Sequence, residues 1–362
     1  MNRTDLPPSL DEYEHEELRV VRGPRSGITI AVAVHSTSRG PAIGGCRLKP
    51  YSSVGEAVAD VLRLSRAMTL KCALADLPHG GGKTVAVVPG SPMNPHAREE
   101  LILDIADTIG QLGGRYITGP DIGTTPEDMA LIHRRTPGGA FCRPETLGGS
   151  GNSSAATARG VRAALDAAVG HVHHADSVAG LRIGVIGFGS VGRLLSESLA
   201  ADGANVIITD VNDRLRSSAL DRGIAWTGAD LLREDLDVLV PAATGGLLDA
   251  DAATACRARL VVGPANNQLA SDDIDARLRE RGITWVPDVI AGAGGIIHAV
   301  CREELACDEQ ETNARIDAIG AKVTRILTHA DTHEITTLQA ADAVIAHPEP
   351  TPARWPWSTH RP

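Results

Sequence analysis

Residues 181–210 read LRIGVIGFGSVGRLLSESLAADGANVIITD: an apolar run, a glycine-rich turn, an amphipathic segment and a second apolar run. Gly187, Gly189 and Gly192 form G-x-G-x-x-G directly after the first apolar run. In that context the first glycine permits a tight turn, the second lets the backbone approach a pyrophosphate, and the third lets helix and strand pack closely. The stretch therefore predicts the strand, helix and strand of a dinucleotide-binding domain, rather than a tight turn without a ligand.

The cofactor site is expected to reach the end of the second strand. The helix that begins at the glycine turn offers unpaired N–H groups and the positive end of its dipole to a phosphate. Asp210 ends the second strand, 18 residues after Gly192, where a carboxylate would accept hydrogen bonds from an adenosine ribose. Because that carboxylate would repel a 2′-phosphate, the sequence favours NAD over NADP.

Strands and helices alternate through the rest of this half of the chain. Further strands are expected at 237–240, 259–262 and 283–286, separated by helical segments. This alternation predicts a Rossmann-type, doubly wound parallel sheet over residues 147–330. The first residues of this range, 147–154, read LGGSGNSS and indicate a hinge or an interior loop.

Residues 1–146 predict a separate α/β domain. The proline-rich end, residues 351–362, is expected to be a flexible tail. The elements predicted for the first domain are strands at 28–35 and 84–89, helices at 54–75 and 97–113, and a short strand from residue 116.

Composition limits the classes of partner. The chain has 362 residues, enough for two domains, and a formal net charge of -10, which disfavours a nucleic-acid or anionic-membrane surface. No apolar run reaches the roughly 18 residues of a membrane span, and the first residues lack the features of a signal peptide. Six cysteines without a CxxC pair indicate reduced thiols, so a cytoplasmic protein is expected.

Three histidines in HVHHAD, His171, His173 and His174, could suggest a metal site. No acidic or thiol cluster accompanies them in the sequence, so a solvated loop is the better interpretation. No metal is expected.

Lysine is scarce in this chain. Lys and Arg together number 35, yet only four are lysines: Lys49, Lys71, Lys83 and Lys322. A retained lysine indicates a task for an amine, because a guanidinium cannot lose its proton near neutral pH. Lys83 follows three glycines in LPHGGGKT, residues 77–84, where the spacing excludes a phosphate-binding P-loop.

Lys71 and Lys83 lie twelve residues apart and suit a substrate that carries a carboxylate and an amine. One lysine can stay charged and bind the carboxylate, while the other, buried near a cation, can act as a base. His79 could tune Lys83 or contact the substrate. The alternative is that both lysines are solvated surface residues.

At these motifs the chain resembles the glutamate/leucine/phenylalanine/valine dehydrogenase family, in its hydrophobic amino-acid branch, over roughly residues 13–330. The resemblance implies NAD-dependent, reversible oxidative deamination of a leucine-, valine- or phenylalanine-type L-amino acid to the 2-oxo acid, ammonia and NADH. It also implies a homo-oligomer, in which residues 1–146 together with a C-terminal helix at about 331–350 form a domain for substrate binding and oligomerisation. An active-site cleft is implied between this domain and the Rossmann-type domain. The segments that carry it are GPAIGGCRLKPY, EAVADVLRLSRAMTLKCALADLPHGGGKT, YITGPDIGTTPEDM, GFGSVG with ITDVN, GPANNQL and PDVIAGAGGIIH.

The resemblance also implies roles for individual residues. Lys83 is the catalytic lysine that assists the attack of water on an iminium carbon, and Asp121 exchanges protons with it. Lys71 binds the substrate α-carboxylate together with the backbone N–H of Gly45, and Asn267 lies near nicotinamide and substrate. The implied cofactor-binding set is Gly187, Phe188, Gly189, Ser190, Val191, Gly192, Asp210, Asn212, Ala242 and Asn267.

By the same resemblance, the pocket for the substrate side chain is lined by four residues: Ile43, Gly119, Ile296 and Ala299. The leucine-type branch usually has Ala and Val at the positions of Gly119 and Ala299, so methyl groups are missing here. This predicts a deeper pocket that favours large hydrophobic substrates. Glutamate is expected to be poor because no spare lysine is evident for its second carboxylate.

The chain departs from the family pattern at Gly292, where asparagine is usual, and around Leu70, where tyrosine and asparagine are usual beside the first lysine. Two alternatives to the leading interpretation therefore stay open. One is an enzyme specialised for a biosynthetic amino acid or imine. The other is a non-catalytic, NAD-binding regulatory protein.

Overall fold

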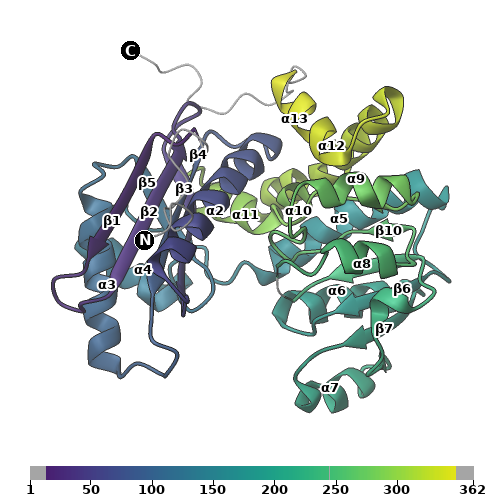
Figure 1. Ribbon diagram of the computed structural model, residues 1–362, viewed down its shortest axis with the longest axis horizontal. Coiled ribbons are helices and arrows are strands. Elements are labelled where there is room, and N and C mark those ends of the chain that lie inside the picture. Colours follow the sequence, from purple (N-terminus) through teal and green to yellow (C-terminus); the bar gives the residue numbers. More distant parts are fainter. Residues whose placement is uncertain (1–13, 244, 348–362) are drawn as a thin grey trace, which may run out of the picture. The chain divides into compact units, whose positions relative to one another are not determined.

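The computed structural model describes residues 14–243 and 245–347 and divides into two compact units (Figure 1). The first contains the described residues up to Asn152 together with Ala299–Ala306. The second contains Ser153–His298 and the described residues from Cys307 onward. Each unit is built around its own sheet with helices packed on it, which confirms the predicted two-domain α/β class.

The first unit has a five-stranded mixed sheet in the order β1-β2-β4-β3-β5. β2 is antiparallel to β1 and β4, whereas β3 runs parallel to both β4 and β5. The strands are β1 (Glu17–Arg22), β2 (Thr29–Ser36), β3 (Ala42–Lys49), β4 (Gly80–Val87) and β5 (Tyr116–Pro120).

Helices cover both faces of this sheet, with α2 (Val54–Leu74) on one side and α3 (Pro95–Gly110) on the other (Figure 1). α4 (Pro126–Arg135) packs beside α3. Each helix begins at a residue whose side chain accepts a backbone N–H, as expected of a good N-cap. These caps are Ser53, Asn94 and Thr125.

The three glycines before Lys83 lie within β4, so this strand begins four residues before the strand predicted at 84–89. Gly80 pairs with Ala42 of β3, and Gly82 pairs with Val34 of β2. A side chain at Gly81 would place its Cβ 2.1 Å from the backbone nitrogen of Thr69 in α2. The glycines therefore let neighbouring protein elements approach the strand, rather than leaving room for a substrate.

The second unit has a six-stranded parallel sheet in the order β11-β10-β9-β6-β7-β8, which confirms the predicted doubly wound sheet. From β6 the chain proceeds to β7 on one side, while β9 lies on the other, so the topological switch point falls between β6 and β9. The strands are β6 (Arg182–Ile186), β7 (Asn205–Thr209), β8 (Ala225–Trp226), β9 (Val238–Pro241), β10 (Leu260–Val261) and β11 (Thr284–Trp285).

Helices of the second unit pack on this sheet and on one another. One core cluster joins Leu239 and Val261 of the sheet to Ala253 of α8 and Leu278 of α9. α11 (Gly294–Glu303) begins in the second unit and ends in the first. The remaining helices are α5 (Ser154–His173), α6 (Ser190–Ala201), α7 (Arg216–Leu220), α8 (Ala250–Ala255), α9 (Asp273–Glu280), α10 (Asp288–Ala291), α12 (Glu309–His333) and α13 (Thr337–Ala346).

The last helix, α13, lies in the second unit, whereas the sequence assigned a helix at about 331–350 to the first domain. The Asp275 carboxylate of α9 accepts hydrogen bonds from the Thr337 hydroxyl at 3.1 Å and from the Leu338 N–H at 2.8 Å. This buried contact fixes α13 to α9. The tail predicted at 351–362 lies outside the described residues.

None of the helices within residues 14–243 and 245–347 has the length and hydropathy needed to cross a membrane.

Gly81→Ala should destabilise the protein. Its methyl group would meet the Thr69 nitrogen at 2.1 Å and the Ser65 carbonyl oxygen at 2.5 Å, and both are backbone atoms that cannot rotate away. We expect the free energy of unfolding in urea to fall by about 1–3 kcal/mol. Gly90→Ala is the matched control, because nothing lies within 4 Å of a Cβ there. Equal stability of the two variants would contradict this packing account.

Candidate active site

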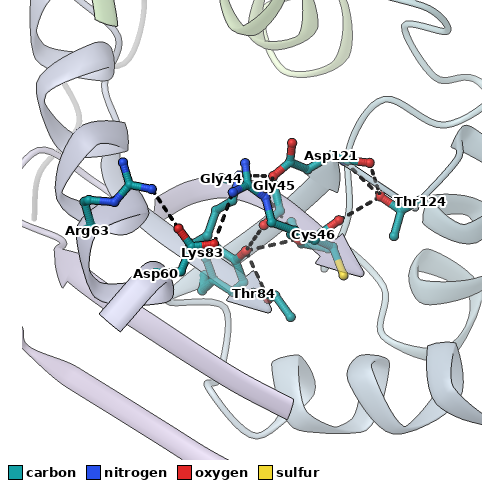
Figure 2. A network of polar contacts seen from close by, with 12 residues as sticks. Gly44, Gly45, Cys46, Asp60, Arg63, Lys83, Thr84, Asp121 and Thr124 are labelled. Atoms are coloured by element: carbon teal, nitrogen blue, oxygen red, sulfur yellow. Dashed lines mark hydrogen bonds and ion pairs between the residues drawn. The ribbon is translucent and has the colours of Figure 1, made fainter. Parts of the chain in front are cut away.

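Lys83 and Asp121 form a buried ion pair in the first unit, with Lys83 in the middle of β4 and Asp121 directly after β5. The lysine Nζ lies 2.6 Å from the aspartate Oδ2, and the side chains are only 8% and 14% exposed. β3 runs between these strands, and Gly45 of β3 lies beside the pair (Figure 2). A Cβ at Gly45 would be 2.8 Å from both Lys83 Nζ and Asp121 Cβ, so a side chain here would disturb the pair.

Arg47 is a second cation at this carboxylate, and the sequence analysis did not single it out. Its Nε donates to Asp121 Oδ2 at 2.9 Å, and its Nη1 donates to Asp60 Oδ2 of α2 at 3.1 Å. Tyr51 also donates to that Asp60 oxygen, at 2.7 Å. The only signal for this role in the sequence was that Arg47 comes two residues after Gly45. Because side chains alternate between the faces of a strand, residues two apart in β3 lie on the same face.

Electrostatics keep Asp121 ionised. Burial acts to raise the pKa of this carboxyl, but the charges of Lys83 and Arg47 outweigh it and hold the pKa well below its ordinary value. The Thr124 hydroxyl accepts a hydrogen bond from the Asp121 N–H at 2.9 Å and donates one to the Cys46 carbonyl at 2.8 Å (Figure 2). These two bonds fix the main chain of Asp121 relative to β3. The site is therefore a charged cluster held by hydrogen bonds to β3 and to the residues that follow β5.

Lys71 and His79 flank the glycine stretch. Lys71 lies in the last turn of α2, is 8% exposed, and belongs to the helix that packs on β4. The His79 ring is bonded elsewhere, with Nε2 at 2.9 Å from Glu304 and Nδ1 at 3.0 Å from the Pro41 carbonyl oxygen. These contacts occupy both nitrogens of His79, so its position does not support the expectation that it tunes Lys83.

Two predicted pocket residues, Ile43 and Gly119, share the face of the sheet that carries Gly45. Ile43 precedes Gly45 by two residues on β3, and Gly119 of β5 is the register partner of Gly45. The ring of Phe141 stands over Gly119, where a Cβ would lie 2.5 Å from two ring carbons. The methyl group missing at Gly119 therefore does not deepen the pocket, because an aromatic ring takes its place.

The other two predicted pocket residues, Ile296 and Ala299, lie on α11. They are 9% and 1% exposed. Ile296 belongs to the second unit and Ala299 to the first.

The glycine turn after β6 has the shape that a dinucleotide phosphate requires. Gly187 adopts φ +112, and a Cβ there would lie 2.8 Å from the carbonyl carbon of Ala242, at the end of β9. A Cβ at Gly192 would lie 2.2 Å from the Gly187 oxygen, whereas nothing lies within 4 Å of one at Gly189. Gly189 caps α6 without a side-chain hydrogen bond, and Ser190 and Val191 begin the helix. These residues fit the phosphates of a bound dinucleotide.

Asp210 closes this turn through its carboxylate. Oδ2 accepts from the Phe188 N–H at 2.7 Å, and Oδ1 accepts from the Asn212 N–H at 2.8 Å. The Phe188 ring packs edge-on against Trp226 of β8, with ring centroids 6.4 Å apart. Each carboxylate oxygen keeps a second lone pair that a ribose hydroxyl could use. Asp210 thus has a structural task that its spacing in the sequence did not reveal.

Asn267 adopts a left-handed backbone conformation, φ 53, and its N–H donates to the buried carboxylate of Asp288. Its carbonyl accepts from the Gly246 N–H at 2.7 Å. Sequence reasoning missed Asp288, although it is the second residue of the quoted segment PDVIAGAGGIIH. Gly292 ends α10 with φ -85, a conformation open to any residue, so the glycine there is not required by the backbone.

Two of the three histidines considered as a metal site have protein partners in the second unit. His171 Nε2 lies 2.8 Å from Asp331 of α12, and His173 Nε2 lies 3.2 Å from the carbonyl of Asp237, the residue before β9. These two side chains therefore join α5 to neighbouring elements.

Comparison with known proteins identifies the family of this chain. Residues 16–137 match the family model described as "Glu/Leu/Phe/Val dehydrogenase, dimerisation domain", and residues 215–347 match "Glutamate/Leucine/Phenylalanine/Valine dehydrogenase". Valine dehydrogenase of Streptomyces virginiae is 38% identical, with 92% of this chain and 93% of that protein covered. Phenylalanine dehydrogenase of Thermoactinomyces intermedius is 36% identical, with 94% and 93% covered.

The same relationship appears among leucine dehydrogenases and solved structures. Leucine dehydrogenase of Bacillus subtilis (strain 168) is 35% identical, with 92% of this chain and 91% of that protein covered. The crystal structure of L-tryptophan dehydrogenase from Nostoc punctiforme superimposes with a TM-score of 0.76 at 28% identity, covering 93% of this chain and 96% of that one.

A dinucleotide-binding parallel sheet, joined in one chain to a sheet with a buried lysine–aspartate pair, defines a nicotinamide-dependent oxidoreductase. The chain belongs to the glutamate/leucine/phenylalanine/valine dehydrogenase family. It is an amino-acid dehydrogenase that acts on the CH–NH2 group of its donor.

The charge pairing at Asp121 should appear as a pH dependence of stability. Because the folded-state pKa is lowered, the pair contributes its full stabilisation above the ordinary Asp pKa of about 3.9. The contribution is lost as the pH falls below that value toward the lowered folded-state pKa. The gap in unfolding free energy between wild type and Asp121→Asn should therefore be largest near neutral pH and shrink in acid.

Urea denaturation of both proteins from neutral pH down to about pH 3 measures this gap. When both proteins also carry Lys83→Met, the difference in unfolding free energy between them should change less with pH. The reason is that one of the two cations that lower the pKa of Asp121 is gone. A gap that does not change with pH would contradict the pairing account.

Proposed function

We propose that this protein catalyses the NAD-dependent, reversible oxidative deamination of a hydrophobic L-amino acid of the leucine, valine or phenylalanine type. The products are the 2-oxo acid, ammonia and NADH. The observation that carries the proposal is the buried contact of 2.6 Å between Lys83 Nζ and Asp121 Oδ2, which joins an amine and an ionised carboxylate. The similarity to valine, phenylalanine and leucine dehydrogenases supports the substrate class.

In this proposal Lys83 and Asp121 handle the protons of the reaction. Lys83 in its free-amine form takes a proton from a water molecule as the water oxygen bonds to the iminium carbon of the oxidised substrate. Asp121 relays that proton from Lys83 to the amino group of the resulting carbinolamine, and the carbinolamine hydroxyl gives its proton to Lys83 as the C=O bond forms and ammonia leaves. A lysine suits this task because its amine can donate and accept a proton, whereas the guanidinium of Arg47 cannot. Arg47 keeps Asp121 oriented toward Lys83.

Lys71 and Gly45 bind the substrate α-carboxylate, Lys71 through its charge and Gly45 through its N–H. Gly45 stands beside the lysine–aspartate pair, which supports this placement. Asn267 is proposed to lie near the nicotinamide and the substrate, oriented by Asp288. A hydride leaves the substrate α-carbon in the oxidation step, and the bound nicotinamide supplies its acceptor.

The engagement of Arg47 beside the Lys83–Asp121 pair supports a substrate with a single carboxylate. Arg47 is engaged by both Asp121 and Asp60, so it is not available to a second substrate carboxylate. Glutamate should therefore be a poor substrate.

We propose NAD as the coenzyme, held by Gly187, Gly189 and Gly192 with the helix N-terminus that follows them. The flanking residues in the proposed cofactor site are Phe188, Ser190, Val191, Asn212 and Ala242. The carboxylate of Asp210 supports NAD over NADP, since it would repel a 2′-phosphate.

We also propose a homo-oligomer and a reducing, cytoplasmic setting. The match of residues 16–137 to a dimerisation domain supports the first, and so does β1, an edge strand on which Val20 is 44% exposed. Six free, buried cysteines support the second. Light scattering of the purified protein tests the assembly, and a monomer at all concentrations would refute it. Cell fractionation tests the compartment, and a secreted protein would refute it.

The decisive assay measures NADH oxidation with ammonia and a panel of 2-oxo acids. Turnover of the branched-chain or aromatic 2-oxo acids supports the proposal. Turnover only of a specialised substrate would favour the biosynthetic alternative. Absence of turnover with retained NAD binding would favour a regulatory protein.

Lys83→Ala should lower kcat by about 10²–10⁴-fold, because it removes a proton-transfer group. Lys83→Arg should be almost as damaging, because guanidinium keeps its proton. The dissociation constant for NAD, measured by calorimetry, should stay within about twofold, since the glycine turn lies in the other unit. Lys322→Ala is the control and should keep wild-type turnover. Wild-type activity in Lys83→Ala would overturn the assignment.

Asp210→Ala should reduce discrimination between the coenzymes. The variant loses the acceptor for two N–H groups of the turn, which lowers kcat/KM for NAD and for NADP alike. It also removes the carboxylate that repels a 2′-phosphate, which favours NADP alone. We therefore expect the ratio of kcat/KM for NAD over NADP to fall by at least about tenfold. A native preference for NADP, or an unchanged ratio in the variant, would refute NAD selection by Asp210.

A further inference from the structure

An aromatic ring stands on the face of the first sheet that carries the lysine–aspartate pair. Gly119 and Gly45 are register partners on parallel strands, so a Cβ on either would point to the same face. At Gly45 that direction leads to Lys83 Nζ, 2.8 Å away, and at Gly119 it leads to the Phe141 ring, 2.5 Å away. With neighbouring strands about 5 Å apart, the ring edge lies within about 10 Å of Lys83 Nζ.

The backbone around Phe141 holds the ring in place. The Phe141 N–H donates to the Thr118 carbonyl at 2.9 Å, and the Thr118 N–H donates to the Gly139 carbonyl at 3.0 Å. On the other side, the Cys142 N–H donates to Glu303 Oε1 at 2.6 Å. Glu303 is itself only 5% exposed and also accepts from the Ser150 hydroxyl at 2.7 Å. The segment that carries Phe141 is therefore tied to β5 and to α11.

The Phe141 ring can limit the space for a substrate side chain, because its backbone is fixed while part of the ring remains exposed to solvent. Phe141 is only half-buried, although the segment around it is fixed. The ring meets Gly119 with its Cε2 and Cζ atoms, so it fills the volume directly over that glycine. A substrate side chain that extends from the pair along this face would meet the ring before it reached Gly119.

Building on the proposed function, we infer that Phe141 is the residue that limits the size of the substrate side chain. The ring closes the space over Gly119, so the site takes a branched aliphatic side chain and excludes an aromatic one. The protein should therefore prefer valine or leucine to phenylalanine, the opposite of what glycine at position 119 predicts when Phe141 is ignored.

Phe141→Ala tests this inference. Removing the ring opens a space of several methylenes, and one methylene in a pocket changes specificity by about 10–200-fold. The ratio of kcat/KM for phenylalanine over valine should rise at least about tenfold above that of the wild type. Gly119→Ala in the Phe141→Ala background should reverse part of that rise, because the added methyl group refills the opened space.

Leu147→Ala is the matched control, since Leu147 follows Phe141 closely in the chain but is 53% exposed. Its phenylalanine-to-valine ratio should equal that of the wild type. If Phe141→Ala does not fold, Phe141→Leu keeps an apolar side chain and should move the ratio in the same direction by a smaller factor.

The outcomes separate this inference from the proposed function. An active wild type that prefers valine or leucine, with a raised ratio in the variant, supports the inference. An active wild type that prefers phenylalanine, or a ratio within about twofold of wild type in the Phe141 variants, overturns it and leaves the proposed function intact. A wild type inactive with every 2-oxo acid overturns both.

Discussion

The buried ion pair between Lys83 and Asp121 constrains how the strands of the first unit are arranged. Removing an ammonium and a carboxylate from water costs several kcal/mol unless each charge is paired and hydrogen-bonded. Here Asp121 is paired twice, by Lys83 and Arg47, and Arg47 is in turn held by Asp60. Lys83 and Asp121 lie on either side of β3, so the residue of β3 between them must have no side chain. Gly45 meets that condition, so the strand order of the sheet and the charge cluster depend on each other.

Local patterns were read correctly from the sequence where one segment makes its own structure. The G-x-G-x-x-G turn is such a case, because Gly192 lies against the backbone oxygen of Gly187 in the same turn. The parallel sheet follows from the alternation of strands and helices. Lysine scarcity also directed attention to Lys83 and Lys71, and the structure buries both.

Features that depend on contacts between segments far apart in the chain could not be predicted from the sequence in the same way. β3 and the start of β4 contain glycines in place of alternating apolar residues, so their strand character is visible only in their pairing. The space over Gly119 is decided by Phe141, which returns to β5 through the bridge between Thr118 and Ala140. Asp288 acts on Asn267 across 21 residues. No periodicity in the sequence encodes these contacts.

The two hydrogen bonds that Asp210 accepts have a consequence for the evolution of the coenzyme site. Under the coenzyme role proposed for Asp210, a lineage that moved toward a phosphorylated coenzyme would have to lose this carboxylate, and the N–H groups of Phe188 and Asn212 would then need new acceptors. Such a change could not proceed through one substitution without loosening the loop that it modifies. In that proposed role one side chain would serve both coenzyme preference and loop architecture, so a switch would require new acceptors for the two N–H groups as well as loss of the carboxylate.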